Sequence, residues 1–389
     1  MSQYRNTVVI LGSTGSIGTQ GLDVISRHPE RFTVTGLVAG GAHVRLLAQQ
    51  VVRHHVPQVA VYDEAAVPAL HEALEEVGAR YTQIQAGPQA VNAIAGSGAD
   101  LVLNGITGSV GLEPSIAALR AGSQLALANK ESVVAGGHLL FGAQVRDDQI
   151  NPVDSEHSAI WQSLRSGTHA EVSRLVVTAS GGPFRGWKRA DMSDITPEQA
   201  LNHPTWHMGP VVTINSSTLM NKGLEFIEAM WLFSMPPEKI DIVVHPQSII
   251  HSMVEYVDGS VMAQMGAPDM MIPIQYALTW PHRYESPART LDLLSCGPLT
   301  FSQPDTGTFT CLASCIEAAK RGGLYPCVVN GANEEAVSLF LQDKIGYLDL
   351  FDAVEAALDH FDLGDYTSVE EVLEADRMAR AFVRERYGK

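Results

Sequence analysis

Short apolar segments rich in branched side chains alternate with amphipathic segments over residues 1–150 of the chain. Runs of branched residues favour strands, and an apolar repeat of about 3.6 residues favours helices. The pattern predicts helices around 22–25 and 44–52, and strands at 7–12, 32–39, 59–61, 101–103 and 125–127. Because strands that alternate with helices in this way form βαβ units, we expect a parallel sheet.

The pattern changes after about residue 150. Strands predicted at 175–178, 241–244 and 261–264 indicate a second α/β region. The segment 195–210 contains three prolines, two histidines and a tryptophan, which is typical of a functional loop that covers a ligand. From about residue 312 the chain is rich in Ala, Leu and Glu with helical periodicity, which predicts a small helical domain.

The fold class that we expect is therefore α/β, with three domains along the chain. A Rossmann-like nucleotide-binding domain covers 1–152, and a central α/β catalytic domain covers 153–287 with a flexible loop at about 181–210. A linker at 288–311, punctuated by Pro and Gly, leads to a C-terminal helical domain at 312–389. A chain of 389 residues is long enough for two or three domains.

Composition narrows the class of protein. Hydrophobic residues make up 45% of the chain and charged residues only 18%, which favours a folded globular protein over extended disorder. The net charge is −17 without any run of Lys or Arg, so we expect no nucleic-acid partner. An anionic substrate must then be held by a few local cations and backbone N–H groups.

The apolar segments and the cysteines bear on the cellular compartment. No apolar stretch reaches the roughly 18 residues of a membrane span, and the N-terminal apolar run is too short for a signal peptide. We therefore expect no membrane partner and a cytoplasmic location. The four cysteines, at 296, 311, 315 and 327, contain no CxxC pair, which argues against a zinc site and favours free thiols.

The glycine-rich turn after the first strand is a candidate nucleotide site. Residues 12–18 read GSTGSIG between a predicted strand and a predicted helix. Glycines permit a tight turn and let backbone N–H groups at the helix N-terminus reach a pyrophosphate. The spacing GxxGxxG is a relative of GxGxxG, and the Lys-Ser/Thr pair of a P-loop is absent. We interpret the turn as nucleotide-binding; a plain turn before a helix is the alternative.

Two polar motifs supply three carboxylates that suit a divalent metal. Asp154 and Glu156 are two residues apart, so both would point the same way in an extended segment. Asn221 and Glu225 lie one helical turn apart, with Lys222 beside them. A capped helix start is the alternative for the first pair, and an ordinary ion-paired helix start is the alternative for the second motif.

Three further motifs have chemistry suited to a substrate. The Ser-Gly-Gly-Pro segment at 180–183 is either a phosphate-binding turn or a plain turn. The Asn-Lys-Glu segment at 129–131 falls at the carboxyl end of a strand, where ligands of parallel sheets bind. His203 and His207 are four residues apart, but Pro204 breaks the helix that would present both to one metal. A substrate contact from a covering loop fits these histidines better.

Taken together, the motifs resemble those of the 1-deoxy-D-xylulose 5-phosphate reductoisomerase family nearly from end to end. The matching segments are GSTGSIG, LANKES, PVDSEH, SGGPFR, HPTWHMG, LMNKGLE and HPQSIIHSMVEY followed by DGS. The resemblance implies an NADP-dependent oxidoreductase in the non-mevalonate isoprenoid pathway. Such an enzyme rearranges 1-deoxy-D-xylulose 5-phosphate and reduces it to 2-C-methyl-D-erythritol 4-phosphate. The resemblance also implies a homodimer.

The same resemblance implies roles for individual residues. A divalent metal (Mg²⁺, Mn²⁺ or Co²⁺) would be held by Asp154, Glu156 and Glu225. The catalytic residues would be Lys130, Glu156 and His203. NADPH would contact Thr14, Gly15, Ser16, Ile17, Gly40, Asn129, Glu131 and Gly209. The substrate would contact Lys130, Ser155, Glu156, Ser180, His203, Ser216, Asn221, Lys222 and Glu225.

The implied chemistry fits these residue types. A metal that chelates carbonyl and hydroxyl oxygens stabilises the oxyanion formed as the carbon skeleton rearranges, and NADPH then reduces the resulting aldehyde. Glu156 would also move protons, and Lys130 would neutralise developing negative charge. The sequence leaves open whether the rearrangement is a retro-aldol/aldol sequence or a direct ketol shift.

The chain departs from the family pattern in three places. Residues 40–43 read Gly-Gly-Ala-His, one residue longer than is usual after the second strand. Pro210 and Asn215 stand where many members have a basic residue and Asp, respectively. The strand end carries no acid that would repel the 2′-phosphate of NADPH. We therefore predict a preference for NADP(H), with His43 or Arg45 contacting that phosphate.

Two other functions stay open on the sequence alone. Another NAD(P)-dependent oxidoreductase, such as a semialdehyde dehydrogenase, needs a catalytic cysteine near the end of the nucleotide domain, whereas all four cysteines lie after residue 295. A non-catalytic nucleotide-binding protein would not need three carboxylates of metal-ligand type beside Lys130 and Lys222.

Overall fold

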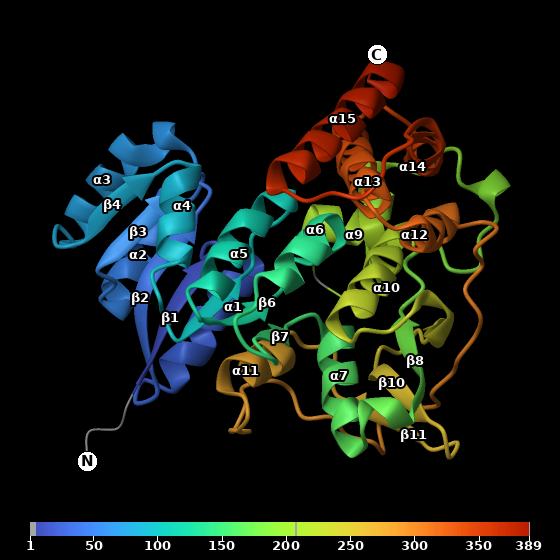
Figure 1. Ribbon diagram of the computed structural model, residues 1–389, viewed down its shortest axis with the longest axis horizontal. Coiled ribbons are helices and arrows are strands. Elements are labelled where there is room, and N and C mark those ends of the chain that lie inside the picture. The colour runs from blue at the N-terminus through green and yellow to red at the C-terminus, as the bar shows by residue number, and fades with distance from the viewer. Residues whose placement is uncertain (1–4, 207, 389) are drawn as a thin grey trace. The chain divides into compact units, whose positions relative to one another are not determined.

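The computed structural model describes residues 5–206 and 208–388, which form two structural units (Figure 1). Unit 1 contains the described residues up to Ser132, together with His138–Asp154 and Met270–Ala288. Unit 2 contains Val133–Gly137, Ser155–Asp269 and the described residues from Arg289 onward. Each unit therefore combines segments that are distant in the sequence.

Unit 1 is built on a seven-stranded sheet whose neighbouring strands are parallel, which confirms the fold class expected from the alternating pattern. The strand order is β4-β3-β2-β1-β5-β6-β7. The order changes direction at β1 and β5, and ligands of such sheets bind at the carboxyl ends of the strands there. The strands are β1 (Asn6–Leu11), β2 (Phe32–Ala39), β3 (Gln58–Val61), β4 (Gln83–Ala86), β5 (Leu101–Asn104), β6 (Gln124–Leu127) and β7 (Ile150–Pro152).

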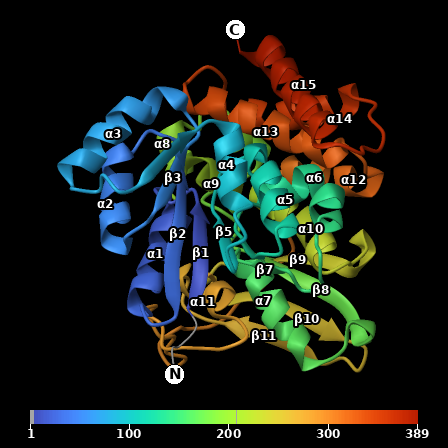
Figure 2. The same ribbon diagram turned by 60° about the vertical axis from the view of Figure 1, so that its left-hand side comes forward.

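Helices connect these strands, and one further helix joins the unit from much later in the chain. That helix, α11 (Met271–Thr279), lies beside α1 in both views (Figures 1 and 2). Its Ile274, Ala277 and Leu278 belong to the hydrophobic core of the sheet. The connecting helices are α1 (Ser16–Arg27), α2 (Val44–His54), α3 (Val67–Glu76), α4 (Pro88–Ala95), α5 (Leu112–Arg120) and α6 (Lys130–Gly142).

The position of α11 bears on the domain boundaries. The predicted central domain, 153–287, includes this helix, whereas its contacts place it with the sheet of unit 1. The backbone carbonyl of Ala277 accepts a 2.8 Å hydrogen bond from Nδ2 of Asn151 in β7. The burial of these three apolar side chains against the sheet places α11 in unit 1, although the chain on either side of Met270–Ala288 belongs to unit 2. The division into three functional domains stays a prediction.

Unit 2 contains a four-stranded mixed sheet in the order β11-β10-β8-β9. β10 is antiparallel to both of its neighbours, and β8 and β9 are parallel. The strands are β8 (Val172–Ala179), β9 (Ile240–Val244), β10 (Ile250–Tyr256) and β11 (Val261–Met265). The helices nearest to the sheet in sequence are α7 (Ser155–Ser163), α8 (Pro197–Leu201), α9 (Pro210–Ser217) and α10 (Met220–Leu232).

The C-terminal part of the chain is helical, as its periodicity predicted. Its helices are α12 (Thr310–Arg321), α13 (Tyr325–Leu341), α14 (Asp349–His360) and α15 (Val369–Tyr387). They share one hydrophobic core with β8 and α10, to which Leu224 and Ile227 contribute from α10, and Cys315 and Val328 from the C-terminal helices. Figure 1 shows α12 beside α10. The C-terminal helices thus support the helix that carries Asn221, Lys222 and Glu225.

Two glycines allow unusually close packing around α10. A Cβ atom on Gly223 would lie 2.5 Å from Cys315 Cβ in α12. A Cβ atom on Gly137, in the part of α6 that belongs to unit 2, would lie 2.5 Å from two atoms of the Trp231 ring. Protein interiors do not tolerate such distances without rearrangement. The position of α10 is therefore fixed from two sides.

Two features bear on the other predictions. The proposed loop at 195–210 contains the helix α8, whose N-cap Thr196 and Gln199 form a capping box. The sequence did not indicate this helix, because five residues carry too few apolar positions to produce a visible period, and the flexible loop stays a prediction. No helix within residues 5–206 and 208–388 is long and apolar enough to cross a membrane.

Candidate active site

The glycine-rich turn lies at the carboxyl end of β1, against the turn that follows β5. Gly12 has φ +78°, and a Cβ atom there would lie 2.7 Å from the carbonyl oxygen of Gly105. A Cβ atom on Gly18 would lie 2.4 Å from the carbonyl oxygen of Gly12. Only glycine fits these contacts, so the sequence motif reflects a turn that closes tightly and brings the start of α1 to the switch point of the sheet.

The N-terminus of α1 is chemically open to an anion. Its N-cap is Gly15, no side chain of the described residues caps it, and its first turn contains no acid. Gly15 and Ser16 are exposed, and Thr14 and Ile17 are partly exposed. Ser13 Oγ is buried and has no hydrogen-bond partner within the described part of the chain. Backbone N–H groups and the helix dipole at such a position favour the pyrophosphate of a dinucleotide.

The end of β2 leads directly to the N-terminus of α2. Gly40 is exposed, His43 is the N-cap of α2, and Arg45 is exposed in its first turn, which contains no acid. The structure adds one acid that the sequence analysis missed: a Cβ atom on Gly41 would lie 3.2 Å from Asp63 Cβ. Asp63 Oδ1 accepts a 2.9 Å hydrogen bond from Ala65 N, so this carboxylate caps the following turn.

The Asn-Lys-Glu motif lies at the start of α6. Asn129 is the N-cap, and its Nδ2 donates hydrogen bonds to Glu131 Oε2 at 2.7 Å and to the Gly108 carbonyl at 3.0 Å. Asn129 and Glu131 are both buried. Lys130 Nζ lies 2.6 Å from Asp154 Oδ2. The motif thus follows the carboxyl end of β6 and presents an amide, a carboxylate and an ammonium group.

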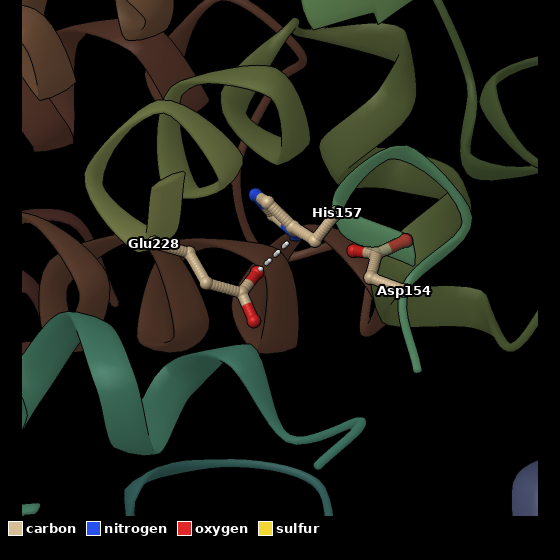
Figure 3. A group of neighbouring side chains, drawn as sticks. All are labelled: Asp154, His157 and Glu228. Carbon is tan, nitrogen blue, oxygen red and sulfur yellow. Dashed lines mark ion pairs between the residues drawn. The ribbon is translucent and has the colours of Figure 1, made fainter. Parts of the chain in front are cut away.

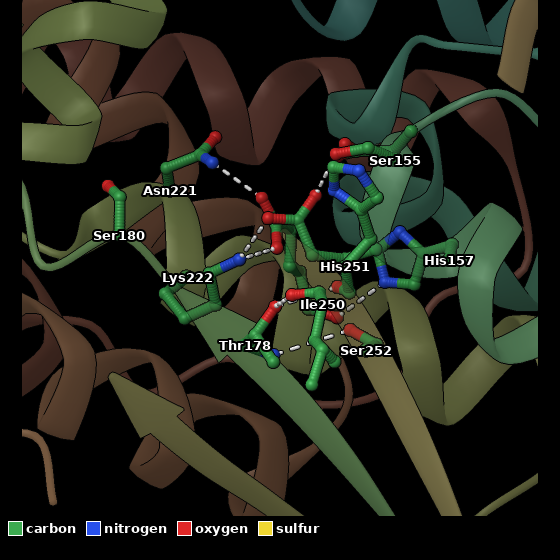
Figure 4. A network of polar contacts seen from close by, with 12 residues as sticks. Ser155, His157, Thr178, Ser180, Asn221, Lys222, Ile250, His251 and Ser252 are labelled. Atoms are coloured by element: carbon green, nitrogen blue, oxygen red, sulfur yellow. Dashed lines mark hydrogen bonds and ion pairs between the residues drawn. The ribbon is translucent and has the colours of Figure 1, made fainter. Parts of the chain in front are cut away.

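The first turns of α7 and α10 meet through a network of charged side chains (Figure 4). Lys222 Nζ lies 2.8 Å from Glu156 Oε1 and also contacts Glu225 Oε2. Asn221 Nδ2 donates to Glu225 Oε1, and Ser155 Oγ donates to Glu156 Oε2 at 2.5 Å. Lys222 and Glu225 form the ion pair of an ordinary helix start, which was the alternative interpretation of this motif. Glu156, on α7, also contacts Lys222.

Burial and charge oppose each other at Lys222. Burial alone would lower the pKa of Lys222, because it disfavours the ammonium form. The carboxylates of Glu156 and Glu225 outweigh that effect, so the pKa of Lys222 is raised. Lys222 is therefore a permanent cation at neutral pH.

Three carboxylates gather at this point with the geometry of a possible metal site. Asp154 immediately precedes α7, and one oxygen from each of Asp154, Glu156 and Glu225 lies within 4.8 Å of the other two. Glu225 is only 1% exposed. Hard oxygen ligands at such distances suit Mg²⁺ or Mn²⁺, with further positions left for substrate or water. The residues present therefore fit a divalent ion.

A second group, His157 and Glu228, lies beside Asp154 and was not indicated by the sequence (Figure 3). His157 Nδ1 lies 3.0 Å from Glu228 Oε2, and His157 Nε2 lies 2.9 Å from the carbonyl oxygen of Glu225. Because a carbonyl only accepts hydrogen bonds, Nε2 carries a proton. Both side chains are buried, and the pair ties α7 to α10. Their spacing of 71 positions offered no local signal.

The hydroxyl groups proposed to contact substrate lie around the turn after β8. Gly181 and Gly182 both have positive φ, and a Cβ atom on Gly182 would lie 2.6 Å from the carbonyl oxygen of Ser216 at the end of α9. The Ser180 turn is thereby held next to Ser216. Figure 4 shows Ser180, Asn221 and Lys222 on one side of the charged network. Hydroxyl, amide and ammonium donors in one region suit a phosphate group.

His203 organises the segment between α8 and α9. Its Nδ1 accepts hydrogen bonds from the backbone N–H groups of Thr205 at 3.1 Å and Trp206 at 2.9 Å. Its Nε2 lies 3.1 Å from Ser180 Oγ. Burial lowers the pKa of His203 from 6.5 to about 4. His203 is thus neutral at pH 7 with its proton on Nε2. His207 lies outside the described residues.

Gly209, Trp206 and His251 also lie in the segments that surround His203 and the charged network. Gly209 is the exposed N-cap of α9. Trp206 is partly buried, with its ring centroid 6.1 Å from that of His251. Burial lowers the pKa of His251, although the charge of Glu156 opposes this. His251 therefore belongs to the charged network, which its position in the sequence did not indicate.

Comparison with known proteins identifies the family. The model for 1-deoxy-D-xylulose 5-phosphate reductoisomerase matches residues 8–137, and models for the C-terminal domains of that enzyme match 150–233 and 265–382. The reductoisomerase of Bifidobacterium longum (strain NCC 2705) is 63% identical over 384 residues, which cover 97% of this chain and 96% of the relative. The chain belongs to the 1-deoxy-D-xylulose 5-phosphate reductoisomerase family.

Other members support this assignment. The reductoisomerase of Beutenbergia cavernae is 55% identical over 96% of this chain and 95% of the relative. The Zymomonas mobilis reductoisomerase, solved in complex with NADPH, matches with a TM-score of 0.91 and 43% identity, over 98% of this chain and 99% of that one. A reductoisomerase solved with NADPH, fosmidomycin and magnesium matches with a TM-score of 0.92 and 36% identity, over 98% of each chain.

The hydrogen bonds of His203 predict its protonation behaviour in this protein. We expect NMR to show the neutral Nε2–H tautomer at pH 7 and a pKa well below 6.5, near 4. Protonation of Nδ1 would break the bonds to Thr205 and Trp206. The contribution of His203 to stability is therefore complete above pH 6.5, decreases below it, and is lost once the pH falls through about 4.

The ring resonances identify the residue and test the assignment. A His203→Asn variant removes the His203 signal and so assigns it in the unmodified protein. A proton on Nδ1 at pH 7, or a pKa of about 6.5 or above, would contradict the assigned hydrogen bonds.

Proposed function

We infer that the protein is an NADPH- and divalent-metal-dependent 1-deoxy-D-xylulose 5-phosphate reductoisomerase. It rearranges and reduces 1-deoxy-D-xylulose 5-phosphate to 2-C-methyl-D-erythritol 4-phosphate in the non-mevalonate isoprenoid pathway. The group of three carboxylates within 4.8 Å, next to lysines and hydroxyl donors, carries this inference. Relatives of this name that cover almost the whole chain, two of them solved with NADPH, support it.

Asp154, Glu156 and Glu225 are the proposed metal ligands. A divalent ion at this position supplies Lewis-acid polarisation of the substrate's carbonyl and hydroxyl oxygens. The protein's contribution is to hold the carboxylates in place: Ser155 and Asn221 donate to Glu156 and Glu225, and the His157–Glu228 pair fixes the two helices that carry them. Such supporting contacts orient metal ligands in other enzymes.

The substrate's phosphate is proposed to bind where hydroxyl and amide donors gather, at Ser180, Ser216 and Asn221, with Lys222 as the cation. Ser180 and His203 are already joined by a 3.1 Å contact. Because the Nδ1 atom of His203 accepts two backbone hydrogen bonds, this residue acts on the substrate as a donor through Nε2 rather than as a base. The segment from His203 to Gly209 would then exclude water from the reaction.

Lys130 and Glu156 are the proposed catalytic residues for charge and proton movement. The Lys130 ammonium lies 2.6 Å from Asp154, where it can neutralise negative charge that develops on a metal-chelating oxygen. Glu156 accepts hydrogen bonds from Ser155 and Lys222, a setting in which a carboxylate can exchange protons with neighbouring hydroxyl groups. These side chains serve either route of rearrangement.

The NADPH site is proposed at Thr14, Gly15, Ser16 and Ile17, with Gly40, Asn129, Glu131 and Gly209. NADPH supplies the hydride, and the protein supplies its placement. The N-terminus of α1, which no side chain of the described residues caps, suits the pyrophosphate. The buried Asn129–Glu131 pair at the start of α6 offers an amide and a carboxylate held in fixed orientation.

The alternative function, that of a semialdehyde dehydrogenase, requires a reactive cysteine near the end of the nucleotide domain. Cys311, Cys315 and Cys327 are fully buried, and burial raises the pKa of all three thiols. Cys296 lies in the segment between α11 and α12. None of the four cysteines follows a strand of the parallel sheet.

Two finer proposals concern location and assembly. We propose a cytoplasmic location, which is supported by four free thiols among the described residues. We also propose a homodimer. β11 lies at the edge of the four-stranded sheet and exposes Val261, Met262 and Met265, by 50%, 40% and 38%. An exposed apolar edge strand is a surface that pairs readily with a second copy of the same chain.

The first prediction tests function and metal site together. Oxidation of NADPH should require both 1-deoxy-D-xylulose 5-phosphate and Mg²⁺ or Mn²⁺, and chelator should abolish it reversibly. Glu225→Gln removes one ligand charge without changing side-chain volume. It should lower turnover on the order of 100-fold or more, while the Kd for NADPH, measured by fluorescence, stays nearly unchanged.

The matched control is Glu255→Gln. This carboxylate also lies in unit 2, but it pairs with Arg174 away from the network, so turnover should be retained. Turnover of Glu225→Gln within a few-fold of the parent at saturating metal would show that Glu225 is not a ligand. Oxidation of NADPH that is independent of this substrate would contradict the function itself.

The second prediction concerns cofactor choice. Arg45→Ala or His43→Ala should weaken the binding of NADPH about tenfold or more, because a charge-assisted hydrogen bond is worth about 1.5–3 kcal/mol. The affinity for NADH, which lacks the 2′-phosphate, should stay nearly unchanged. Arg53→Ala is the control, since it removes a cation eight residues further along the same helix. Equal kcat/KM for NADH and NADPH in the parent would refute the preference for NADP(H). Unchanged NADPH affinity in both Arg45→Ala and His43→Ala would refute the proposed contacts with the 2′-phosphate.

The third prediction concerns assembly. Light scattering should give the mass of two chains for the parent. Met262→Lys on β11 should shift the measured mass toward that of one chain, because a charge on an edge strand opposes pairing. Met378→Lys adds the same charge at an exposed methionine of α15 and should leave the mass unchanged. A single-chain mass for the parent at all concentrations would disprove the dimer.

A further inference from the structure

Lys222 takes up the carboxylate oxygens that a metal would need. Its Nζ lies 2.8 Å from Glu156 Oε1 and contacts Glu225 Oε2. The other oxygen of each carboxylate also has a donor, because Ser155 Oγ donates to Glu156 Oε2 and Asn221 Nδ2 donates to Glu225 Oε1. Figure 4 shows the contacts that run from the ammonium group of Lys222 as dashed lines.

The contact has a clear electrostatic reason. The side chain of Lys222 is 5% exposed and those of Glu156 and Glu225 are 16% and 1% exposed. Two carboxylates this close together and this far from water repel each other unless a cation lies between them. In the metal-free protein Lys222 is that cation. The third carboxylate is neutralised in the same manner, by Lys130 at 2.6 Å from Asp154.

The ammonium and a metal ion compete for this position. A divalent ion would bind these oxygens at about 2.1 Å, which would place it within about 4 Å of Nζ in a buried site, where like charges repel strongly. Of the donors in the network, Ser155 and Asn221 are neutral and have no such conflict. Lys222 also has a long, flexible side chain that can move its charge by several rotamer changes.

We propose that Lys222 is an exchangeable counter-ion: a divalent metal displaces its ammonium group from Glu156 and Glu225, and the released ammonium then serves the anionic substrate. The second half rests on the proposed function, which supplies a phosphorylated substrate. The consequence is an order of binding, metal before sugar phosphate. Because coupling between binding sites is reciprocal, the bound sugar phosphate in turn increases the affinity for the metal, since it holds Lys222 away from the carboxylates.

The test measures binding of Mn²⁺ alone to the full chain, by calorimetry, without substrate or NADPH. Lys222→Met preserves side-chain length and removes the competing charge, so Mn²⁺ should bind about tenfold tighter or more. The metal-free variant should also melt at a lower temperature than the parent, because two carboxylates lose their counter-ion, and Mn²⁺ should raise its Tm by more than it raises that of the parent.

Two variants serve as controls. Lys222→Arg keeps the charge and should bind Mn²⁺ with nearly the parent's affinity. Arg185→Met removes a nearby cation whose Nη1 donates to the carbonyl oxygen of Ser180 at 3.0 Å and not to a metal ligand, so it should change Mn²⁺ affinity by less than about twofold. An unchanged or weaker affinity in folded Lys222→Met overturns the proposal.

A measurement on the unmodified protein keeps the proposal testable if Lys222→Met does not fold. Acetylation of Lys222, quantified by mass spectrometry of its peptide, should increase several-fold when Mn²⁺ is added, because the ammonium leaves its buried contacts. Unchanged or reduced labelling at saturating Mn²⁺ contradicts displacement. Failure of Mn²⁺ to bind the parent would instead contradict the proposed metal site, so the two failures are distinguishable.

Discussion

The structure of the site depends on one electrostatic constraint, the gathering of three carboxylates in a place with little access to water. Such a group is stable only when cations and hydrogen-bond donors surround it. The chain meets this requirement with Lys130 and Lys222, and with Ser155 and Asn221 as neutral donors. Three of the motifs recognised in the sequence, LANKES, PVDSEH and LMNKGLE, therefore belong to one charged network, to which each contributes a carboxylate or a partner for one.

The constraint also explains why α10 is packed so closely. The first two turns of α10 carry Lys222 and Glu225, and both must lie close to α7 for Lys222 to contact Glu156. Gly223 and Gly137 let neighbouring helices approach α10 where any side chain would collide, and the His157–Glu228 pair joins α7 to α10 directly. Rigid elements thus carry the charged groups. The segment around His203 is held differently, by hydrogen bonds of a neutral ring to two backbone N–H groups.

Much of the fold could be predicted because buried parallel strands contain continuous apolar runs, such as residues 8–11 in β1. β4 was missed because its sequence, QIQA, has only one large apolar residue, and β7 because its three residues, INP, include a proline at the sheet edge. The return of α11 to the sheet of unit 1 has no local signal at all. It is decided by which surface buries Ile274 and Leu278, and that is a property of the folded chain.

The site shows the same division between local and distant information. Spacing within α10 indicated that Asn221, Lys222 and Glu225 act together, and the resemblance assigned their ligands, but neither could show which groups touch in the absence of those ligands. The structure pairs Lys222 with the carboxylates rather than leaving it open for a phosphate. One ammonium cannot neutralise two buried carboxylates and a phosphate at full strength together. A metal that replaces it at the carboxylates removes this conflict, so the arrival of the metal is what makes the cation available to the sugar phosphate.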